Sequence, residues 1–302
     1  MPVAFALLVI VGAWTLPAAA QGDGTAVGLS VWSAIVLGLV EGLTEYLPVS
    51  STGHLLVTTE LLGLGGTEAE ETALDAYAIC IQAGAILAVV FLYHQRIRQM
   101  VDGLLGRSDD GRRIMLAVVA AFVPTAIIGL AFGSLVRENL FGVLPTATAW
   151  LVGGIAIVMI TRMGLLDRAG IELHEITLAQ AGLIGFGQAI ALWPGVSRSL
   201  VTIIAALIVG LCLRAAVEFS FLLGLITLSA ATLLTAVQEG DLLIDTFGLA
   251  TPLIGLVVAF GAAVASVRWM VAWLQERGLD IFGYYRIVIG LAAFAALSLG
   301  WL

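Results

Sequence analysis

Six long apolar segments restrict the possible folds of this chain more than any other feature of its sequence. They cover about residues 73–93, 114–135, 145–163, 217–237, 249–274 and 284–302. A helix of about 20 apolar residues spans the hydrocarbon core of a bilayer, where lipid-exposed irregular backbone is not tolerated. The sequence therefore predicts an all-α polytopic membrane protein with six transmembrane helices.

The composition agrees with this prediction and excludes other classes of protein. Hydrophobic residues make up 61% of the 302 positions and charged residues 11%, whereas soluble domains have about 45–50% and 25%. The formal net charge is −8 and every basic residue is an arginine. Binding to nucleic acid phosphates needs a basic surface, so we expect no nucleic-acid partner. The two cysteines form no metal-binding pair and no disulfide framework.

The N-terminal segment has two interpretations. Its first twenty residues are apolar and end in Pro17-Ala18-Ala19-Ala20, which resembles the apolar core and small-residue cleavage site of a signal peptide. The run has no positively charged start, so an uncleaved N-terminal helix is the alternative. We assign residues 1–24 to one of these two and residues 25–302 to a single membrane-embedded domain.

Arginine placement orients the spans, because cytoplasmic loops of membrane proteins are enriched in basic residues. The segment after the 73–93 span carries five arginines and is predicted to be a cytoplasmic loop. The segment before that span carries three acids and no base, so it is predicted to lie outside. Alternation then places the acidic stretch 239–245 in an outer loop, and Arg137 is the one exception. The five arginines are Arg96, Arg98, Arg107, Arg112 and Arg113.

Two further apolar stretches, 29–62 and 178–213, are interrupted at their middle by a proline with glycine and polar residues. Two full crossings by the arms of each stretch would preserve the same sidedness, but the arms are short, which favours two re-entrant helical hairpins. The arginine pattern predicts that the first hairpin opens outward and the second inward. This is an inverted-topology repeat with halves of about 29–135 and 178–275. In such folds the site lies near the midplane, where broken helices meet.

The first interrupted stretch carries a pair of acidic residues. Glu41 and Glu45 are four positions apart and share one face of a helix. Carboxylates inside an apolar run are costly unless they are paired, protonated or bound to a cation. Hard divalent cations prefer carboxylate oxygens, so Glu41 and Glu45 are predicted to bind a metal. Solvation of both residues at the membrane surface is the alternative.

Small hydroxyl residues follow this acidic pair. Pro48 breaks the incoming helix, and Ser50, Ser51 and Thr52 suit the start of a new one. A helix N-terminus offers free N–H groups and a positive dipole end, so these residues are predicted to bind phosphate. The His54 ring could reach a seryl hydroxyl, which would form a minimal nucleophile–base pair. Capping serines with a structural histidine are the alternative.

The second interrupted stretch repeats this pattern and adds a cation. Arg198 stands at membrane depth, where an arginine is costly and usually marks an anionic partner. Its fork of donors suits phosphate; an arginine extending to the cytoplasmic surface is the alternative. Together, the two breaks fit a lipid phosphate substrate and catalysis by positioning and charge stabilisation. The hydroxyls around Arg198 are those of Ser197, Ser199 and Thr202.

These residues carry a resemblance to a known family. The run from Glu41 to His54, EGLTEYLPVSSTGH, closely resembles the first motif of the undecaprenyl pyrophosphate phosphatases of the bacitracin-resistance type. The run from Pro194 to Ser199 with Thr202 resembles the second motif. The similarity covers residue 29 to the C-terminus. It implies a plasma-membrane hydrolase that removes the terminal phosphate of a polyprenyl pyrophosphate and regenerates the monophosphate carrier for cell-envelope glycan synthesis.

The resemblance also implies roles for individual residues. Glu41 and Glu45 match the acidic pair, which assists metal binding or proton transfer. Ser51 matches the proposed nucleophile, His54 its base and Arg198 the arginine that holds phosphate. Attack by a metal-bound water instead of Ser51 is the alternative. The resemblance further implies an active site opening to the outer face and a divalent cation, Mg²⁺ or Ca²⁺. The expected partners are the polyprenyl pyrophosphate and membrane lipids, and a homodimeric assembly is left open.

A secondary transporter or lipid flippase is the alternative from another functional class. An inverted repeat with broken helices suits transport as well as hydrolysis. A flippase for lipid phosphates would use the arginine and the helix N-termini but would not need a nucleophile and its base. Release of phosphate from a polyprenyl pyrophosphate therefore separates the two functions.

Overall fold

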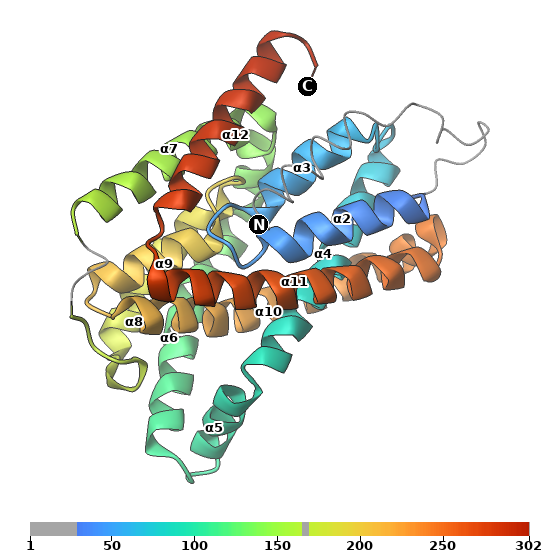
Figure 1. Ribbon diagram of the computed structural model, residues 1–302. Coiled ribbons are helices and arrows are strands. Elements are labelled where there is room, and N and C mark those ends of the chain that lie inside the picture. Colours follow the sequence, from blue (N-terminus) through green and yellow to red (C-terminus); the bar gives the residue numbers. More distant parts are fainter. Residues whose placement is uncertain (1–28, 165–168, 302) are drawn as a thin grey trace.

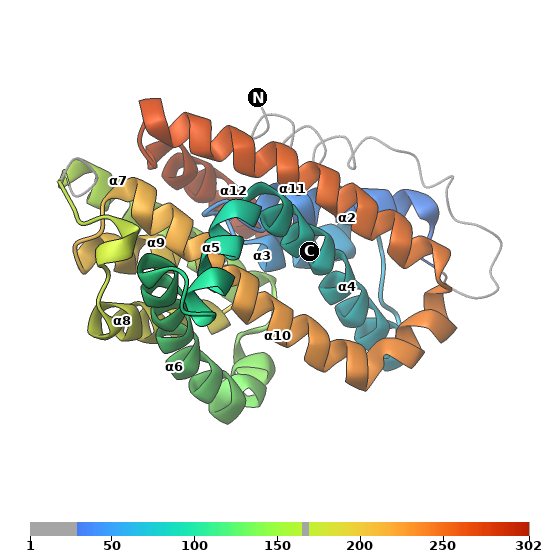
Figure 2. The ribbon, with the colours of Figure 1, turned by 90° about the horizontal axis from the view of Figure 1, so that it is seen from below.

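A computed structural model describes residues 29–164 and 169–301 of the chain, and this part is built from helices. It contains no β-strand, apart from an isolated bridge between Ile171 and Leu211. Six helices are long and apolar enough to cross a membrane, which confirms the six predicted spans. They are α4 (Glu68–Leu92), α6 (Asp109–Leu140), α7 (Val143–Arg162), α10 (Leu213–Phe247), α11 (Ala250–Glu276) and α12 (Asp280–Ser298). The helix α4 packs against both α10 and α11 and lies between them in Figure 2.

Two pairs of short helices lie among the long ones (Figure 1). The first pair is α2 (Val31–Thr44) and α3 (Ser51–Leu61). The second is α8 (Leu178–Gln188), continued by the 3₁₀ turn η3 (Ala189–Leu192), and α9 (Arg198–Ile208); another 3₁₀ turn, η2 (Leu173–Glu175), precedes it. The breaks within the pairs coincide with the two predicted interruptions. Re-entry of these pairs from opposite membrane faces stays a prediction.

The leading helix of each pair packs closely on a long helix through a glycine. A Cβ atom on Gly38 of α2 would lie 2.5 Å from the carbonyl oxygen of Gly255 in α11. A Cβ atom on Gly185 of α8 would lie 2.7 Å from the carbonyl carbon of Ala121 in α6. Small residues permit this backbone approach between membrane helices. Gly38 and Gly185 are separated by the same number of residues as Ser50 and Ser197, so the two pairs of short helices align without a gap from the glycine to the serine.

Two expectations about connections are wrong. The arginine-rich segment after α4 is not a simple loop, because it contains the helix α5 (His94–Leu104). Figure 1 shows α5 and the beginning of α6 as a hairpin that projects from the other helices. Its arms touch at Gly103, where a Cβ atom would lie 2.7 Å from the Cα atom of Arg112. The acidic stretch 239–245 is not a loop either, because α10 continues as a helix through it.

Three further expectations concern Arg137, the N-terminal segment and the two repeat halves. Arg137, the exception to the arginine pattern, forms an ion pair of 2.6 Å with Asp75 of α4. The predicted signal peptide or N-terminal helix of residues 1–24 lies outside the described residues. The division into two repeat halves stays a prediction.

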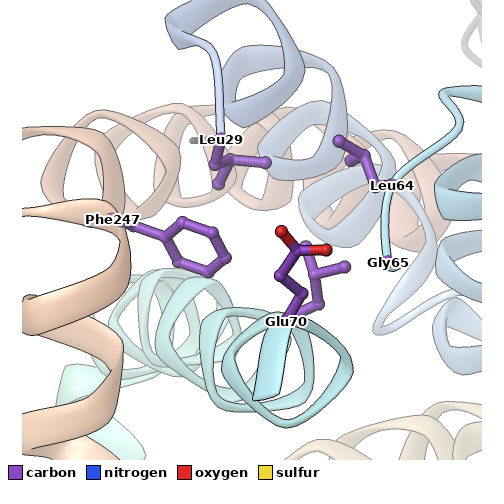
Figure 3. A pocket seen from close by; sticks show the side chains of 6 residues that line it. Leu29, Leu64, Gly65, Glu70 and Phe247 are labelled. Atoms are coloured by element: carbon purple, nitrogen blue, oxygen red, sulfur yellow. The ribbon is translucent and has the colours of Figure 1, made fainter. Parts of the chain in front are cut away.

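A small pocket lies where the start of α2, the α3–α4 connection and the end of α10 meet (Figure 3). Its one charged side chain, Glu70, accepts a hydrogen bond of 2.9 Å from the backbone N–H of Gly66. The lining includes none of the predicted site residues, so this pocket is separate from the two breaks. The lining residues are Leu29, Leu64, Gly65, Glu70, Leu74 and Phe247.

Candidate active site

The helices α3 and α9 begin in the same unusual way. Their N-cap residues, Ser50 and Ser197, have φ angles of 75° and 72° and are the only non-glycine residues with positive φ in the described part of the chain. Each hydroxyl accepts a hydrogen bond from an N–H three residues on, that of Gly53 at 3.4 Å and that of Leu200 at 3.3 Å. Backbone in such sparsely populated regions concentrates at functional sites. The first N–H groups of both helices have no partner within the helix and can receive an anion.

Hydrogen bonds hold the two breaks together. The Ser199 hydroxyl donates to the carbonyl of Leu47 at 2.8 Å, and the Ser197 hydroxyl donates to the same carbonyl at 3.5 Å. The indole N–H of Trp150 in α7 donates to the neighbouring carbonyl of Val49 at 3.0 Å. In this structure, the predicted phosphate-binding serines of the second break thus connect it to the first break.

Three predicted site residues meet between the breaks. The Glu45 carboxylate accepts a hydrogen bond from the Ser51 hydroxyl through Oε2. Its Oε1 accepts another, of 2.8 Å, from the Arg198 guanidinium. The side chains of Arg198 and Glu45 are 11% and 5% exposed, so the ion pair is shielded from solvent. Both oxygens of the buried carboxylate are therefore satisfied, as a desolvated charge requires.

Arg198 is enclosed in a cradle of residues from two other segments, the first break and α10. Its guanidinium carbon lies 5.7 Å from the centre of the Tyr46 ring, and its NH1 group donates to the carbonyl of Ser220 at 3.4 Å. A Cβ atom on Gly224 of α10 would lie 2.7 Å from that guanidinium carbon, so this glycine makes room for it. The Thr202 hydroxyl is 2.6 Å from the Ser220 hydroxyl and joins α9 to α10.

The predicted hydrogen bond between His54 and a seryl hydroxyl is wrong. The His54 ring turns toward α12, where its Nε2 lies 2.8 Å from the Tyr285 hydroxyl and its plane is within 3° of the Tyr285 ring. Its Nδ1 lies 2.6 Å from the carbonyl oxygen of Ser50. Because a carbonyl only accepts, Nδ1 carries the proton and Nε2 of the neutral ring accepts from the tyrosine. Ser51 instead donates to Glu45, which approaches it from the break before α3.

Glu41 supplies a second buried carboxylate beside the first. Its side chain interacts with those of Glu45 and Ser51, and its Oε1 has no hydrogen-bond partner. The described residues contain no cluster of three or more acidic, histidine or cysteine side chains arranged around a metal position. Two carboxylates are nevertheless enough for Mg²⁺, which commonly takes its other ligands from water and substrate phosphate. The orphaned oxygen and the oxygen-rich surroundings therefore fit a divalent cation.

The remaining residues near the breaks have simpler environments. Thr52, predicted to bind phosphate, is exposed on the first turn of α3. Gln188 occupies the position equivalent to Glu41, but its amide donates to Thr125 at 2.9 Å and to Thr227 at 3.3 Å, so it serves a separate buried contact.

Sequence reasoning did not identify two residues of α12 that contact the breaks, Tyr285 and Arg286. The sequence signal for Arg286 was that it is an arginine inside an apolar span. Its position near the start of the 284–302 span made it resemble an ordinary arginine at a membrane surface. The structure instead buries Arg286 completely.

Comparisons with known proteins agree with this arrangement. The family model described as Bacitracin resistance protein BacA matches residues 34–292. The chain is 41% identical to an undecaprenyl-diphosphatase of Sorangium cellulosum over 86% of this chain and 84% of the relative. It is 40% identical to undecaprenyl-diphosphatase 2 of Rhodospirillum rubrum over 87% of this chain and 93% of that protein. Since the family match includes both breaks, five of the six long helices and the first part of α12, the chain belongs to the bacitracin resistance protein BacA family.

Proposed function

We propose that the protein is a membrane phosphatase that hydrolyses undecaprenyl pyrophosphate to undecaprenyl monophosphate and inorganic phosphate. The contact of Ser51, Glu45 and Arg198 beside two helix N-termini carries this proposal, because it combines a nucleophile, a proton acceptor and an anion-binding group. The relatives are undecaprenyl-diphosphatases, which supports undecaprenyl pyrophosphate as the lipid substrate. They give no support to the transporter or flippase alternative. The product would return to cell-wall synthesis as the lipid carrier.

The first chemical step is proposed to be attack by Ser51 on the terminal phosphorus. The hydroxyl proton passes to Glu45, which already accepts its hydrogen bond. The bond from the Ser51 oxygen to phosphorus forms as the bridging P–O bond breaks, and the lipid monophosphate leaves with the bonding electrons. Arg198 and the first N–H groups of α3 and α9 stabilise the charge on the phosphoryl oxygens.

The second step returns the enzyme to its starting state. Water attacks the phosphoserine as the bond between phosphorus and the Ser51 oxygen breaks. Glu45 returns to that oxygen the proton that it accepted in the first step, and inorganic phosphate leaves with both protons of the water. His54 is not placed to accept the Ser51 proton. Its Nδ1–H instead binds the carbonyl of Ser50, which orients the N-terminus of α3.

A divalent cation is proposed to bind between Glu41 and Glu45. When bound, Mg²⁺ or Ca²⁺ would neutralise charge on the pyrophosphate. We expect purified protein to release phosphate from undecaprenyl pyrophosphate, and a chelator to lower the rate roughly tenfold or more until Mg²⁺ or Ca²⁺ is restored. Glu41→Gln should require a higher concentration of added metal for half-maximal activity, because it loses one carboxylate ligand.

The control for this experiment is Glu60→Gln, which changes an exposed glutamate on α3 and should leave the metal requirement unchanged. Full activity in the presence of chelator would contradict the proposed cation. Absence of phosphate release by the wild type with metal and substrate present would contradict the proposed function.

The site is proposed to open to the outer face of the plasma membrane. The arginine-rich hairpin of α5 and the beginning of α6 supports this orientation, because basic connections favour the cytoplasm. A membrane-impermeant maleimide should label Glu60→Cys on intact cells, in a background lacking Cys80 and Cys212. It should label Arg107→Cys only after permeabilisation, and the reverse pattern would contradict the orientation.

A further inference from the structure

Arg286 is a completely buried cation whose described surroundings contain no acidic partner. It lies on α12 with 0% of its surface exposed, and none of the described ion pairs includes it. A desolvated guanidinium is costly, so an arginine inside a membrane domain needs strong compensating contacts. All its hydrogen bonds go to backbone carbonyls, and its Nε atom has no partner.

The acceptors of Arg286 come from both breaks. Its NH1 group donates to the carbonyl of Pro48 at 3.3 Å, and its NH2 group donates to that of Gly195 at 2.8 Å. Each of these carbonyls stands two residues before an N-cap serine, Ser50 or Ser197. The Arg286 side chain therefore forms hydrogen bonds with equivalent positions of the two breaks.

The helix α7 completes the surroundings of this side chain. The NH2 group of Arg286 also donates to the carbonyl of Ala149 at 2.8 Å. A Cβ atom on Gly153 would lie 2.8 Å from the guanidinium carbon, so a larger residue there would displace it. The neighbouring Tyr285 binds His54, which holds the Ser50 carbonyl. The helix α12 thus reaches the first break through two adjacent residues and the second break through Arg286.

We propose that Arg286 is a positioning residue, which fixes the N-termini of α3 and α9 relative to each other by binding the Pro48 and Gly195 carbonyls. This inference rests on the proposed phosphatase function, because the two termini carry Ser51 and Arg198. A misplacement of about 1 Å between reacting groups can cost roughly a hundredfold in rate. A contact that sets the distance between the two termini therefore affects the reaction more than it affects binding of the lipid.

The decisive variant is Arg286→Lys. Lysine keeps the charge, but its compact ammonium cannot replace the planar guanidinium group, which donates hydrogen bonds to carbonyls of three segments. We expect kcat for phosphate release to fall about 10- to 100-fold. KM should stay within about threefold, because Arg198 and the helix N-termini remain to bind the pyrophosphate. The number of binding sites for a non-hydrolysable polyprenyl methylene-bisphosphonate should stay at the wild-type value, which shows that the protein is folded and competent.

The matched control is Arg268→Lys, since Arg268 lies exposed on α11 and should tolerate the change without loss of kcat. Gly153→Ala is the second variant, because it disturbs the same contacts while keeping the arginine. If Arg286→Lys does not fold, Gly153→Ala must show the same fall in kcat. Unchanged kcat in a folded variant, or a fall matched by loss of binding sites, would overturn the inference.

Hydrogen exchange gives a readout that does not depend on activity. Arg286→Lys should increase amide exchange at 50–53 and at 197–200 together, relative to Arg268→Lys. Unchanged exchange at both segments would overturn the inference even if the phosphatase function is correct. Failure of the wild type to release phosphate would reject the proposed function, while the exchange result would still decide whether Arg286 holds the two breaks.

Discussion

Replacement of Arg198 by lysine is expected to lower kcat for phosphate release about a thousandfold. Arginine contacts to a transferring phosphoryl group contribute roughly 10³ or more to the rate, and a lysine cannot reproduce the two-pronged geometry. Lysine is preferable to alanine here, because removing one partner of a buried ion pair costs about 3–5 kcal/mol. Steady-state phosphate release, compared with thermal unfolding of the same sample, would measure the effect.

The control for this prediction is Arg137→Lys, because Arg137 also pairs with a carboxylate but on an exposed surface. Surface ion pairs contribute about 0–1 kcal/mol, so its activity and stability should be nearly unchanged. A kcat of Arg198→Lys within tenfold of the wild type would contradict the role of Arg198.

The cradle of Arg198 gives an independent test of the same role. Gly224→Ala should displace the guanidinium and reduce kcat although Arg198 itself is retained, because the added Cβ would lie 2.7 Å from the guanidinium carbon. Gly261→Ala is its matched control, since a Cβ there would have nothing within 4 Å. Equal activity of the two alanine variants would show that the position of Arg198 does not matter.

The second large effect is expected for Glu45→Gln. Glutamine retains the shape of the side chain but cannot accept the Ser51 proton, and loss of a general base typically costs about 10²–10⁴ in rate. We expect a fall of about a thousandfold in kcat for Glu45→Gln and about tenfold for His54→Asn. His54 contacts Ser50 and Tyr285, whereas Ser51 donates to Glu45.

Acid quenching with substrate labelled in its terminal phosphate would separate the steps. The wild type should yield labelled phosphoserine, and both Ser51→Ala and Glu45→Gln should yield none. A larger loss of kcat in His54→Asn than in Glu45→Gln would return the role of base to His54. Absence of label in the wild type under rapid quenching would favour direct attack by water.

Much of the fold could be predicted because membrane spans are local features. A run of about 20 apolar residues must become a helix in lipid, whatever its neighbours are. The same applies to the breaks, since Pro48 interrupts a helix and the serines that follow can cap a new one. The helix α5 was missed because its helical pattern lies in a polar segment whose arginines were interpreted only as an orientation signal.

The sequence by itself determined the membrane class, the six spans, the two breaks and the polar residues that stand at them. Only the tertiary structure decided which of these residues touch. Ser51 binds Glu45 rather than His54, and Arg286 joins two breaks that are far apart in the sequence. The physical reason is that helix formation depends on neighbours along the chain. The partner of a buried polar group instead depends on which helices pack around it, because a buried polar group without a hydrogen bond is costly in a setting without water.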